Sequence, residues 1–220
     1  MIDIIFGGCA VTLLGSGAML LANQSTLCVS DLHLGKSERV ARRTGQLFPP
    51  YENLETLSRL EQELEVHNCK QVICLGDSFD DLDAMQDLPE SDALWLTRLM
   101  AGRRWIWIEG NHDPGPINLG GSHLESVQVA RIEFRHIASP SIAPQISGHF
   151  HPKARVNTGR RNISRACFVV GKTKIIMPAF GTYTGGLSVQ DPVIATIFDS
   201  EADVVLTGNT MARFPFSALR

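Results

Sequence analysis

The chain has 220 residues, 44% hydrophobic and 20% charged, which is the composition of an ordinary globular protein and excludes a disordered one. Its formal net charge of −3 and pI near 6.2 argue against a general nucleic-acid coat protein. No apolar run reaches the roughly 18 residues of a membrane span, and the first residues lack the basic start of a signal peptide. The five cysteines form no CxxC pair. We therefore expect a mature cytoplasmic protein without disulfides and without a membrane partner.

Charge is distributed unevenly along the chain. No Asp or Glu lies between Phe134 and Gln190, although eight Lys and Arg residues do. Such a segment favours a local positive field on a mildly acidic protein. An ordinary pair of solvated surface strands explains the same pattern equally well. The eight basic residues are Arg135, Lys153, Arg155, Arg160, Arg161, Arg165, Lys172 and Lys174.

The first half of the chain shows strand patterns in regular order. Apolar residues on either side of Gly15-Ser16-Gly17 predict a β-hairpin. Three short apolar runs, Thr26–Val29, Gln71–Leu75 and Trp105–Ile108, are typical of buried strands.

Helical patterns separate these strands. After Pro49-Pro50, leucines recur at positions 54, 57, 60 and 64, a spacing that predicts an amphipathic helix. Ser91 is a suitable N-cap for a second helix that ends near Met100.

After about residue 126 the chain becomes rich in short β-type runs. Two packed sheets with helices outside are the architecture that this order favours. No repeat, low-complexity tract or linker is visible, so residues 1–220 are expected to form one α/β (α+β) domain. The runs are Val127–His136, Gln145–Ser147, Ala166–Val170, Lys174–Met177, Val193–Phe198 and Asp203–Leu206.

Four polar clusters each follow a predicted strand. They are Asp31-Leu32-His33, the segment from Gly76 to Asp80, the segment from Gly110 to Asp113, and Gly148-His149-Phe150-His151. Ligand sites of open α/β sheets gather beyond the carboxyl ends of strands, so the four loops are expected to converge. Each cluster alone is weak evidence, but all four in this order are poorly explained by chance.

The residue types in these clusters suit metal ions. Asp, Asn and His offer oxygen and nitrogen donors without thiolate, a set that fits Mn²⁺, Fe or Zn²⁺. A carboxylate such as Asp77 can bridge two cations about 3.5–4 Å apart, as in two-metal phosphoryl chemistry. Four of the seven histidines lie in the clusters, and His136 ends a strand just before the last one. His67 and His123 are interpreted as structural.

The order DxH, GDxxD, GNHD, His, GHxH resembles the calcineurin-like metallophosphoesterases. This resemblance implies a four-layer sandwich of two mixed β-sheets flanked by α-helices, and two divalent ions, Mn²⁺ in the first place with Fe or Zn²⁺ as alternatives. It implies that His112 contacts the phosphate and the leaving oxygen, and that Asp113 orients His112. The implied ligands are Asp31, His33 and His151 for one ion, Asn111, His136 and His149 for the other, and Asp77 for both.

A narrower resemblance concerns the substrate. The stretch Pro178–Leu187 (PAFGTYTGGL) is similar to the ligase-associated DNA damage response endonucleases (PdeM type). The resemblance implies cleavage of single-stranded DNA held through backbone phosphates, and a DNA ligase and a helicase as partners. Lys36, Arg160 and Arg161 are the candidate substrate-binding residues. One departure is Asp80, where that family commonly has His. A second carboxylate near the ions would repel phosphate unless it is paired or faces away.

The expected reaction is hydrolysis of a phosphodiester by a metal-bridged hydroxide, without a covalent enzyme intermediate. Two other hypotheses remain open at this stage. One is a phosphodiesterase or phosphatase for nucleotides or cyclic phosphodiesters. The other is a repair scaffold with a vestigial metal site, against which the complete ligand set argues.

Overall fold

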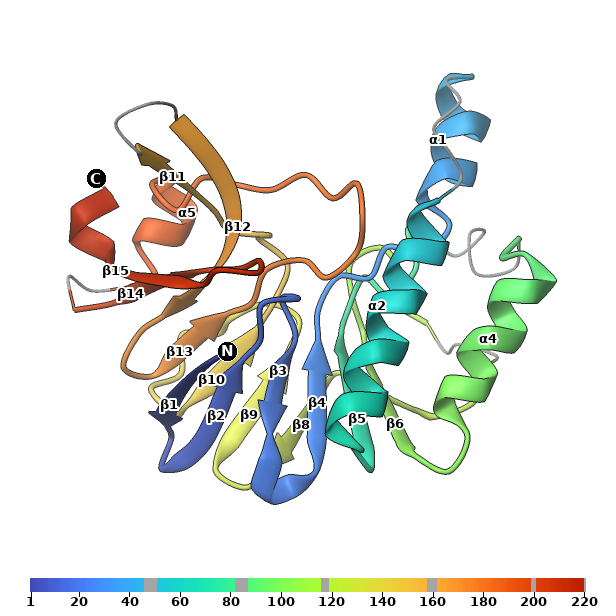
Figure 1. The fold of residues 1–220 in the computed structure, drawn as a ribbon, viewed down its shortest axis with the longest axis horizontal. Helices are drawn as coiled ribbons and strands as arrows, with labels where there is room; N and C mark the ends of the chain where they lie inside the picture. The colour runs from blue at the N-terminus through green and yellow to red at the C-terminus, as the bar shows by residue number, and fades with distance from the viewer. Residues whose placement is uncertain (46–50, 82–86, 116–118, 158–161, 199–200, 220) are drawn as a thin grey trace.

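The computed structural model describes residues 1–45, 51–81, 87–115, 119–157, 162–198 and 201–219 (Figure 1). Within them, two mixed β-sheets face each other and helices cover the outer faces, as the sequence predicts. No helix in these ranges combines the length and the apolar character needed to cross a membrane.

The first sheet has seven strands in the simple order β1 to β7. Its first half is an antiparallel meander, and β4 then begins a parallel half that runs through β7. The strands are β1 (Ile2–Phe6), β2 (Cys9–Leu13), β3 (Met19–Leu21), β4 (Thr26–Val29), β5 (Gln71–Leu75), β6 (Arg104–Ile108) and β7 (Ser122–Leu124).

The parallel half of this sheet confirms the predicted buried strands. Every residue of β4 is buried, as are all but the first residues of β5 and β6. A parallel strand covered on both faces reads as a continuous apolar run, which is the pattern that the sequence shows. The predicted hairpin is also present, as β2 and β3.

The second sheet has eight strands, with seven in the order β15-β14-β12-β13-β10-β9-β8 and β11 paired with β12. Its centre is parallel, with β10 between β9 and β13, and its outer pairs are antiparallel. The strands are β8 (Ser126–Val129), β9 (Ile132–Arg135), β10 (Gln145–Ser147), β11 (Lys153–Asn157), β12 (Asn162–Val170), β13 (Lys174–Ile176), β14 (Asp203–Leu206) and β15 (Ala212–Pro215).

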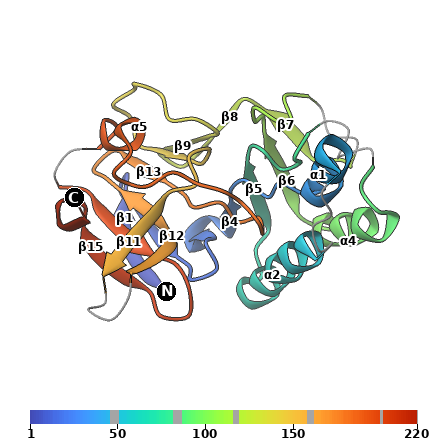
Figure 2. The same ribbon diagram turned by 90° about the horizontal axis from the view of Figure 1, so that it is seen from above.

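Three apolar cores separate the layers. One lies between the first sheet and the helices α2 (Glu52–His67) and α4 (Glu90–Met100), which lie side by side in Figures 1 and 2. The central core fills the space between the two sheets. The third lies between the second sheet and the short helices α5 (Pro192–Ala195) and η2 (Phe216–Leu219). The other helices among the described residues are α1 (Lys36–Thr44) and the short η1 (Ala22–Gln24).

Several predicted elements differ in detail. The run Val193–Phe198 is not a strand, because Pro192 begins α5 and the Asp191 side chain accepts a hydrogen bond from the Val193 N–H at its start. Ser91 is not an N-cap: α4 begins at Glu90, and the Ser91 hydroxyl contacts Asp92. The run Val127–His136 is the hairpin of β8 and β9, turned by Ala130 in a left-handed conformation.

The topology gathers four loops at one edge of the molecule. The parallel strands β4, β5 and β6 point the same way, so the loops that follow them lie next to one another. The loops that follow β9 and β10 of the second sheet reach the same edge, since the Gly148 N–H donates to the His136 carbonyl and the His149 N–H donates to the Asp31 carboxylate.

Candidate metal centre

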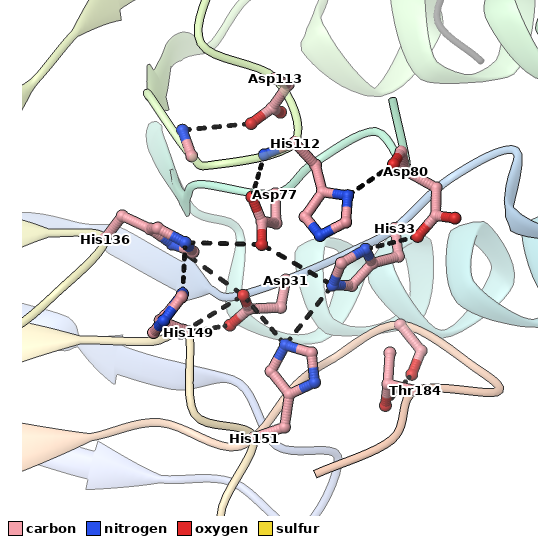
Figure 3. Close-up of polar contacts among 12 residues, drawn as sticks. Asp31, His33, Asp77, Asp80, His112, Asp113, His136, His149, His151 and Thr184 are labelled. Atoms are coloured by element: carbon pink, nitrogen blue, oxygen red, sulfur yellow. Dashed lines mark hydrogen bonds and ion pairs between the residues drawn. The ribbon is translucent and has the colours of Figure 1, made fainter. Parts of the chain in front are cut away.

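The four predicted loops converge, and their Asp and His side chains point toward one another (Figure 3). Among the described residues, three groups of side chains can each offer one ligand atom per residue with all atoms within 4.8 Å of one another, and two of these groups contain six of the seven predicted ligands. The first is Asp31, His33 and His151. The second is Asp77, His136 and His149. Each of these two groups combines residues that follow strands of both sheets. The third group is His33, Asp80 and His112.

The first group is tightly spaced. His151 Nε2 lies 3.1 Å from Asp31 Oδ1 and 3.4 Å from His33 Nε2. Asp31 is fully buried, and Ser30 Oγ donates to its Oδ2. The second group is equally close: His136 Nε2 lies 3.4 Å from Asp77 Oδ2 and 3.1 Å from His149 Nδ1.

Asp77 belongs to the second group and also faces the first. Its Oδ2 is 4.0 Å from His33 Nε2 in the first group and 3.4 Å from His136 Nε2 in the second. Its Oδ1 accepts a hydrogen bond from the His112 N–H. One carboxylate oxygen is therefore placed to face both positions, which is the arrangement that a shared ligand requires.

Hydrogen bonds to backbone and carboxylate oxygens set the tautomers of two histidines. His136 Nδ1 donates to the Leu75 carbonyl at 2.8 Å, and His33 Nδ1 donates to Asp80 Oδ1 at 2.7 Å. In the neutral form of each ring, Nε2 is then the nitrogen with the lone pair, and it faces the carboxylates. Partners of this kind orient metal-binding imidazoles in proteins.

The charges at this centre fit a site for cations. Asp31 and Asp77 are both buried, and their ion-pair partners among the described residues are histidines only. Burial works against the ionised form of Asp31, but hydrogen bonding and positive charge at His151 and His136 outweigh it and lower its pKa. Burial likewise opposes charge on His136, yet the carboxylates of Asp77 and Asp31 raise its pKa to about 9. The centre therefore favours added positive charge.

The backbone of the centre is strained. Nine described residues other than glycine have a positive φ, and five of them are predicted ligands. Left-handed backbone costs on the order of 1–3 kcal/mol at residues other than glycine and collects at functional sites. The five are Asp31 (φ 53°), His33 (φ 47°), Asp77 (φ 45°), His149 (φ 71°) and His151 (φ 46°).

Comparison with known proteins agrees with this geometry. The family model described as calcineurin-like phosphoesterase matches residues 25–153, more than half of the chain. The chain belongs to the calcineurin-like phosphoesterase family. Among solved structures, the nuclease MPE of Pseudomonas putida is similar, with 25% identity, a TM-score of 0.78, and coverage of 97% of this chain and 99% of that one.

A second solved structure, an uncharacterized protein of Streptococcus pneumoniae TIGR4 described as a predicted phosphoesterase, aligns at 15% identity. Its TM-score is 0.32, with 87% and 89% of the two chains covered. No curated protein matches. As a calcineurin-like phosphoesterase with these Asp and His groups, the protein is a metal-dependent phosphoesterase.

Asp80 is paired, which removes the conflict that its charge posed for a phosphoesterase site. It is fully buried, it accepts from His33 Nδ1, and it forms ion pairs with Lys36 Nζ at 3.7 Å and with Arg39 Nε. Burial opposes its charge, but the contact with His33 and the positive charge of Lys36 outweigh burial and lower its pKa. Asp80 therefore orients His33 and does not point a free charge at the centre.

Asp113 is placed differently from the family expectation. Its carboxylate does not contact the His112 ring. It accepts hydrogen bonds from the backbone N–H groups of Ser78 and Phe79 and from that of Gly110. Burial raises its pKa to about 6, and these backbone donors oppose the rise. Asp113 thus joins two of the ligand loops, and the Asp80 carbonyl orients His112 by accepting from its Nδ1 at 2.7 Å.

The remaining predicted site residues are Asn111, Lys36, Arg160 and Arg161. Asn111 is exposed and lines a pocket of about 230 Å³ together with His136. Lys36 is half-buried beside Asp80. Arg160 and Arg161 lie outside the described residues.

The backbone of the PAFGTYTGGL stretch is hydrogen-bonded to the loop that carries Asp31. Phe180 and Gly181 donate their N–H groups to the carbonyls of Ser30 and Asp31. From α2, Arg59 donates to the Phe180 carbonyl and Thr56 Oγ1 accepts from the Thr182 N–H. Neither Arg59 nor Thr56 belongs to a recognisable motif, and their only signal in the sequence is a polar side chain within an amphipathic helix.

Gly181 lies close to the first ligand loop because it lacks a side chain. A Cβ at this position would lie 2.1 Å from the Leu32 carbonyl oxygen and 2.9 Å from that of Asp31. We expect Gly181→Ala to displace the Asp31 loop, and so to lower both the melting temperature and the metal content of the protein. Overpacking of this kind costs about 1–3 kcal/mol.

Gly185→Ala is the matched control, since a Cβ there has no neighbour within 4 Å. Thermal denaturation and elemental analysis of the two variants test the prediction. Equal melting temperatures and equal metal contents would show that the Asp31 loop tolerates displacement.

Proposed function

We propose that the protein is a DNA endonuclease that acts in DNA repair and hydrolyses phosphodiester bonds of single-stranded DNA with two divalent ions. The observation that carries the two-ion proposal is the division of six Asp and His side chains into two adjacent groups, with Asp77 Oδ2 facing both. A site for one ion would not need the second group.

Each ion has a set of ligands in this proposal. Asp31, His33 and His151 hold the first, His136 and His149 with Asn111 hold the second, and Asp77 is shared. The donor set suits Mn²⁺ first, with Fe or Zn²⁺ as alternatives. When bound, such ions lower the pKa of a water molecule and neutralise phosphoryl oxygens.

His112 is the proposed acid for the leaving oxygen. Its Nδ1 donates to the Asp80 carbonyl, so Nε2 is the nitrogen free to carry and release a proton. The ring is half-buried and packs edge-on to His33, with centroids 5.3 Å apart. Figure 3 shows it beside Asp77 and above His33. A substrate phosphate bound at the two groups would lie within reach of Nε2.

The choice of DNA rests on similarity. The Pseudomonas putida structure is described as a nuclease, and its likeness spans nearly the full length of both chains. The PAFGTYTGGL stretch resembles the ligase-associated endonucleases, which supports single-stranded DNA as substrate and a DNA ligase and helicase as partners.

Cleavage of circular single-stranded DNA tests the proposal. A circle has no ends, so only an endonuclease can open it. We expect linear product to form with Mn²⁺ and not with EDTA. Hydrolysis of bis(p-nitrophenyl) phosphate with no cleavage of the circle would instead assign the protein to small phosphodiesters. Inactivity on both substrates with full metal loading would favour a scaffold role.

A further inference from the structure

A groove of about 960 Å³ lies between the two halves of the fold, behind the PAFGTYTGGL stretch. Its walls are formed by helix α2, the turn between β2 and β3, the start of β11 at Lys153, the β12 strand, the loop from Ala179 to Thr184, and the turn between β14 and β15. These segments meet near the middle of Figure 1. The metal-binding loops do not line this groove.

The groove carries an excess of positive charge. Arg59, Lys153 and Arg165 line it, and Glu63 is the one carboxylate among its described lining residues. Glu63 Oε2 lies 3.2 Å from His67 Nε2, so this carboxylate has a partner among the residues that line the groove.

Two of these cations are bound only by neutral groups. Lys153 Nζ donates to the Thr184 carbonyl, and Arg165 Nη1 donates to the carbonyls of Thr207 and Thr210. Within the described part of the chain, neither forms an ion pair. Both belong to the acid-free segment of the sequence, so their positive charge remains available to an anion.

The backbone of the stretch that contains Gly181 and Gly186 separates the groove from the metal centre. Gly181 lines the groove and also donates to the Asp31 carbonyl. Gly186 lies between the Lys153 side chain and the His151 backbone, since a Cβ on it would be 3.2 Å from the one and 2.2 Å from the other. In Figure 3, Thr184 of the same loop lies beside His151.

Tyr183 connects the groove with a second hollow on the other side of this backbone. It lines the groove, and it also lines a small apolar pocket with Lys36, Ser37 and Val40 of α1, on the side of Asp80. Tyr183 is 45% exposed, and its backbone is left-handed, with φ 60°. A partly exposed aromatic ring that lines two hollows offers a surface on which a base can stack.

We propose that the groove binds the backbone of a single DNA strand next to the bond that is cleaved, with phosphates on Lys153 and Arg165 and an unpaired base stacked on Tyr183. This inference rests on the proposed nuclease function and adds to it a binding path for the single strand. Basic side chains bind backbone phosphate by counterion release, and aromatic rings accept any base.

The test measures binding of a fluorescein-labelled single strand by anisotropy over a series of salt concentrations. The Mn²⁺-loaded His112→Ala protein is the background, so that the strand stays intact. Lys153→Gln and Arg165→Gln should each weaken binding roughly 3- to 10-fold and reduce the salt slope by about 0.7. Arg213→Gln is the matched control, because Arg213 pairs with Asp203 outside the groove. Its affinity and slope should equal those of the background.

Tyr183 is tested with two variants that both keep a Cβ and so the same backbone strain. Tyr183→Leu should weaken binding about 5-fold or more, whereas Tyr183→Phe keeps the ring and should bind like the background. Equal losses in both variants would overturn stacking and point to the hydroxyl group. Melting temperatures establish that each variant is folded.

The outcomes separate this inference from the function on which it rests. A wild-type protein that neither binds nor cleaves single-stranded DNA contradicts the nuclease itself. A wild-type protein that cleaves the strand, with Lys153→Gln and Arg165→Gln binding as tightly as Arg213→Gln, contradicts the groove alone.

Discussion

Asp77→Asn is expected to lower the metal content of the purified protein from about two ions per chain to below one. Asp77 Oδ2 faces both ligand groups, so a neutral amide there weakens both positions at once. Loss of a hydrogen-bond partner outside the ligand set already costs about 10- to 100-fold in metal affinity or activity. Replacement of a shared ligand should reduce phosphodiester turnover by more than this range.

Asn is preferred to Ala for this experiment because it tolerates the left-handed backbone of Asp77 and can still accept from the His112 N–H. Elemental analysis after dialysis gives the metal content, and Asp203→Asn on β14 serves as the control. Two ions retained by Asp77→Asn would show that Asp77 is not shared.

His112→Ala is expected to reduce turnover about 10²- to 10⁴-fold, the usual contribution of a positioned acid or base, while metal content stays normal. His112 lies outside the Asp31 and Asp77 groups, its candidate group is the one with His33 and Asp80, and its Nδ1 is occupied by the Asp80 carbonyl. The loss should appear in kcat, since the ring is assigned to the leaving oxygen.

The control for this variant is His123→Ala, which removes an imidazole from β7 on the edge of the first sheet. Kinetics on bis(p-nitrophenyl) phosphate and elemental analysis are measured for both proteins. A His112→Ala enzyme that loses its ions along with its activity would make His112 a ligand instead of an acid.

The strands that carry the centre were predictable because they are buried on both faces. β4, β5 and β6 are short apolar runs that end in polar residues, a pattern that can be recognised in the sequence. The α5 segment was predicted wrongly because its apolar residues suit a strand, and the hydrogen bond from Val193 to the Asp191 side chain decides for a helix. A cap outweighs propensity in so short an element.

The ligand residues were visible in the sequence because each loop carries its own motif, but their partners were not. Asp113 lies next to His112 in the chain, yet its carboxylate faces the backbone of Ser78 and Phe79. The pairing of Asp80 with Arg39 joins residues 41 positions apart. Contacts of this kind depend on how loops pack, which spacing along the chain does not reveal.

The Gly-rich stretch shows the same limit of sequence reasoning. A glycine-rich run such as Gly181–Gly186 ordinarily indicates a tight turn with positive φ, and Gly186 does have φ 153°. At position 181 glycine is required for a different reason, because the Leu32 carbonyl approaches too closely for a side chain. The groove behind it is built from segments that are far apart in the sequence and has no local signature.

The ligand groups also bear on how the chain folds. The Asp31 and Asp77 groups each unite residues from the two sheets, and His33 and His151 meet across 118 positions of sequence. Neither group can form until both sheets have docked, so the centre is expected to assemble last. Ions that bind only the completed centre would then act as cross-links between the sheets. They would slow the unfolding of a chain whose five described cysteines are all free.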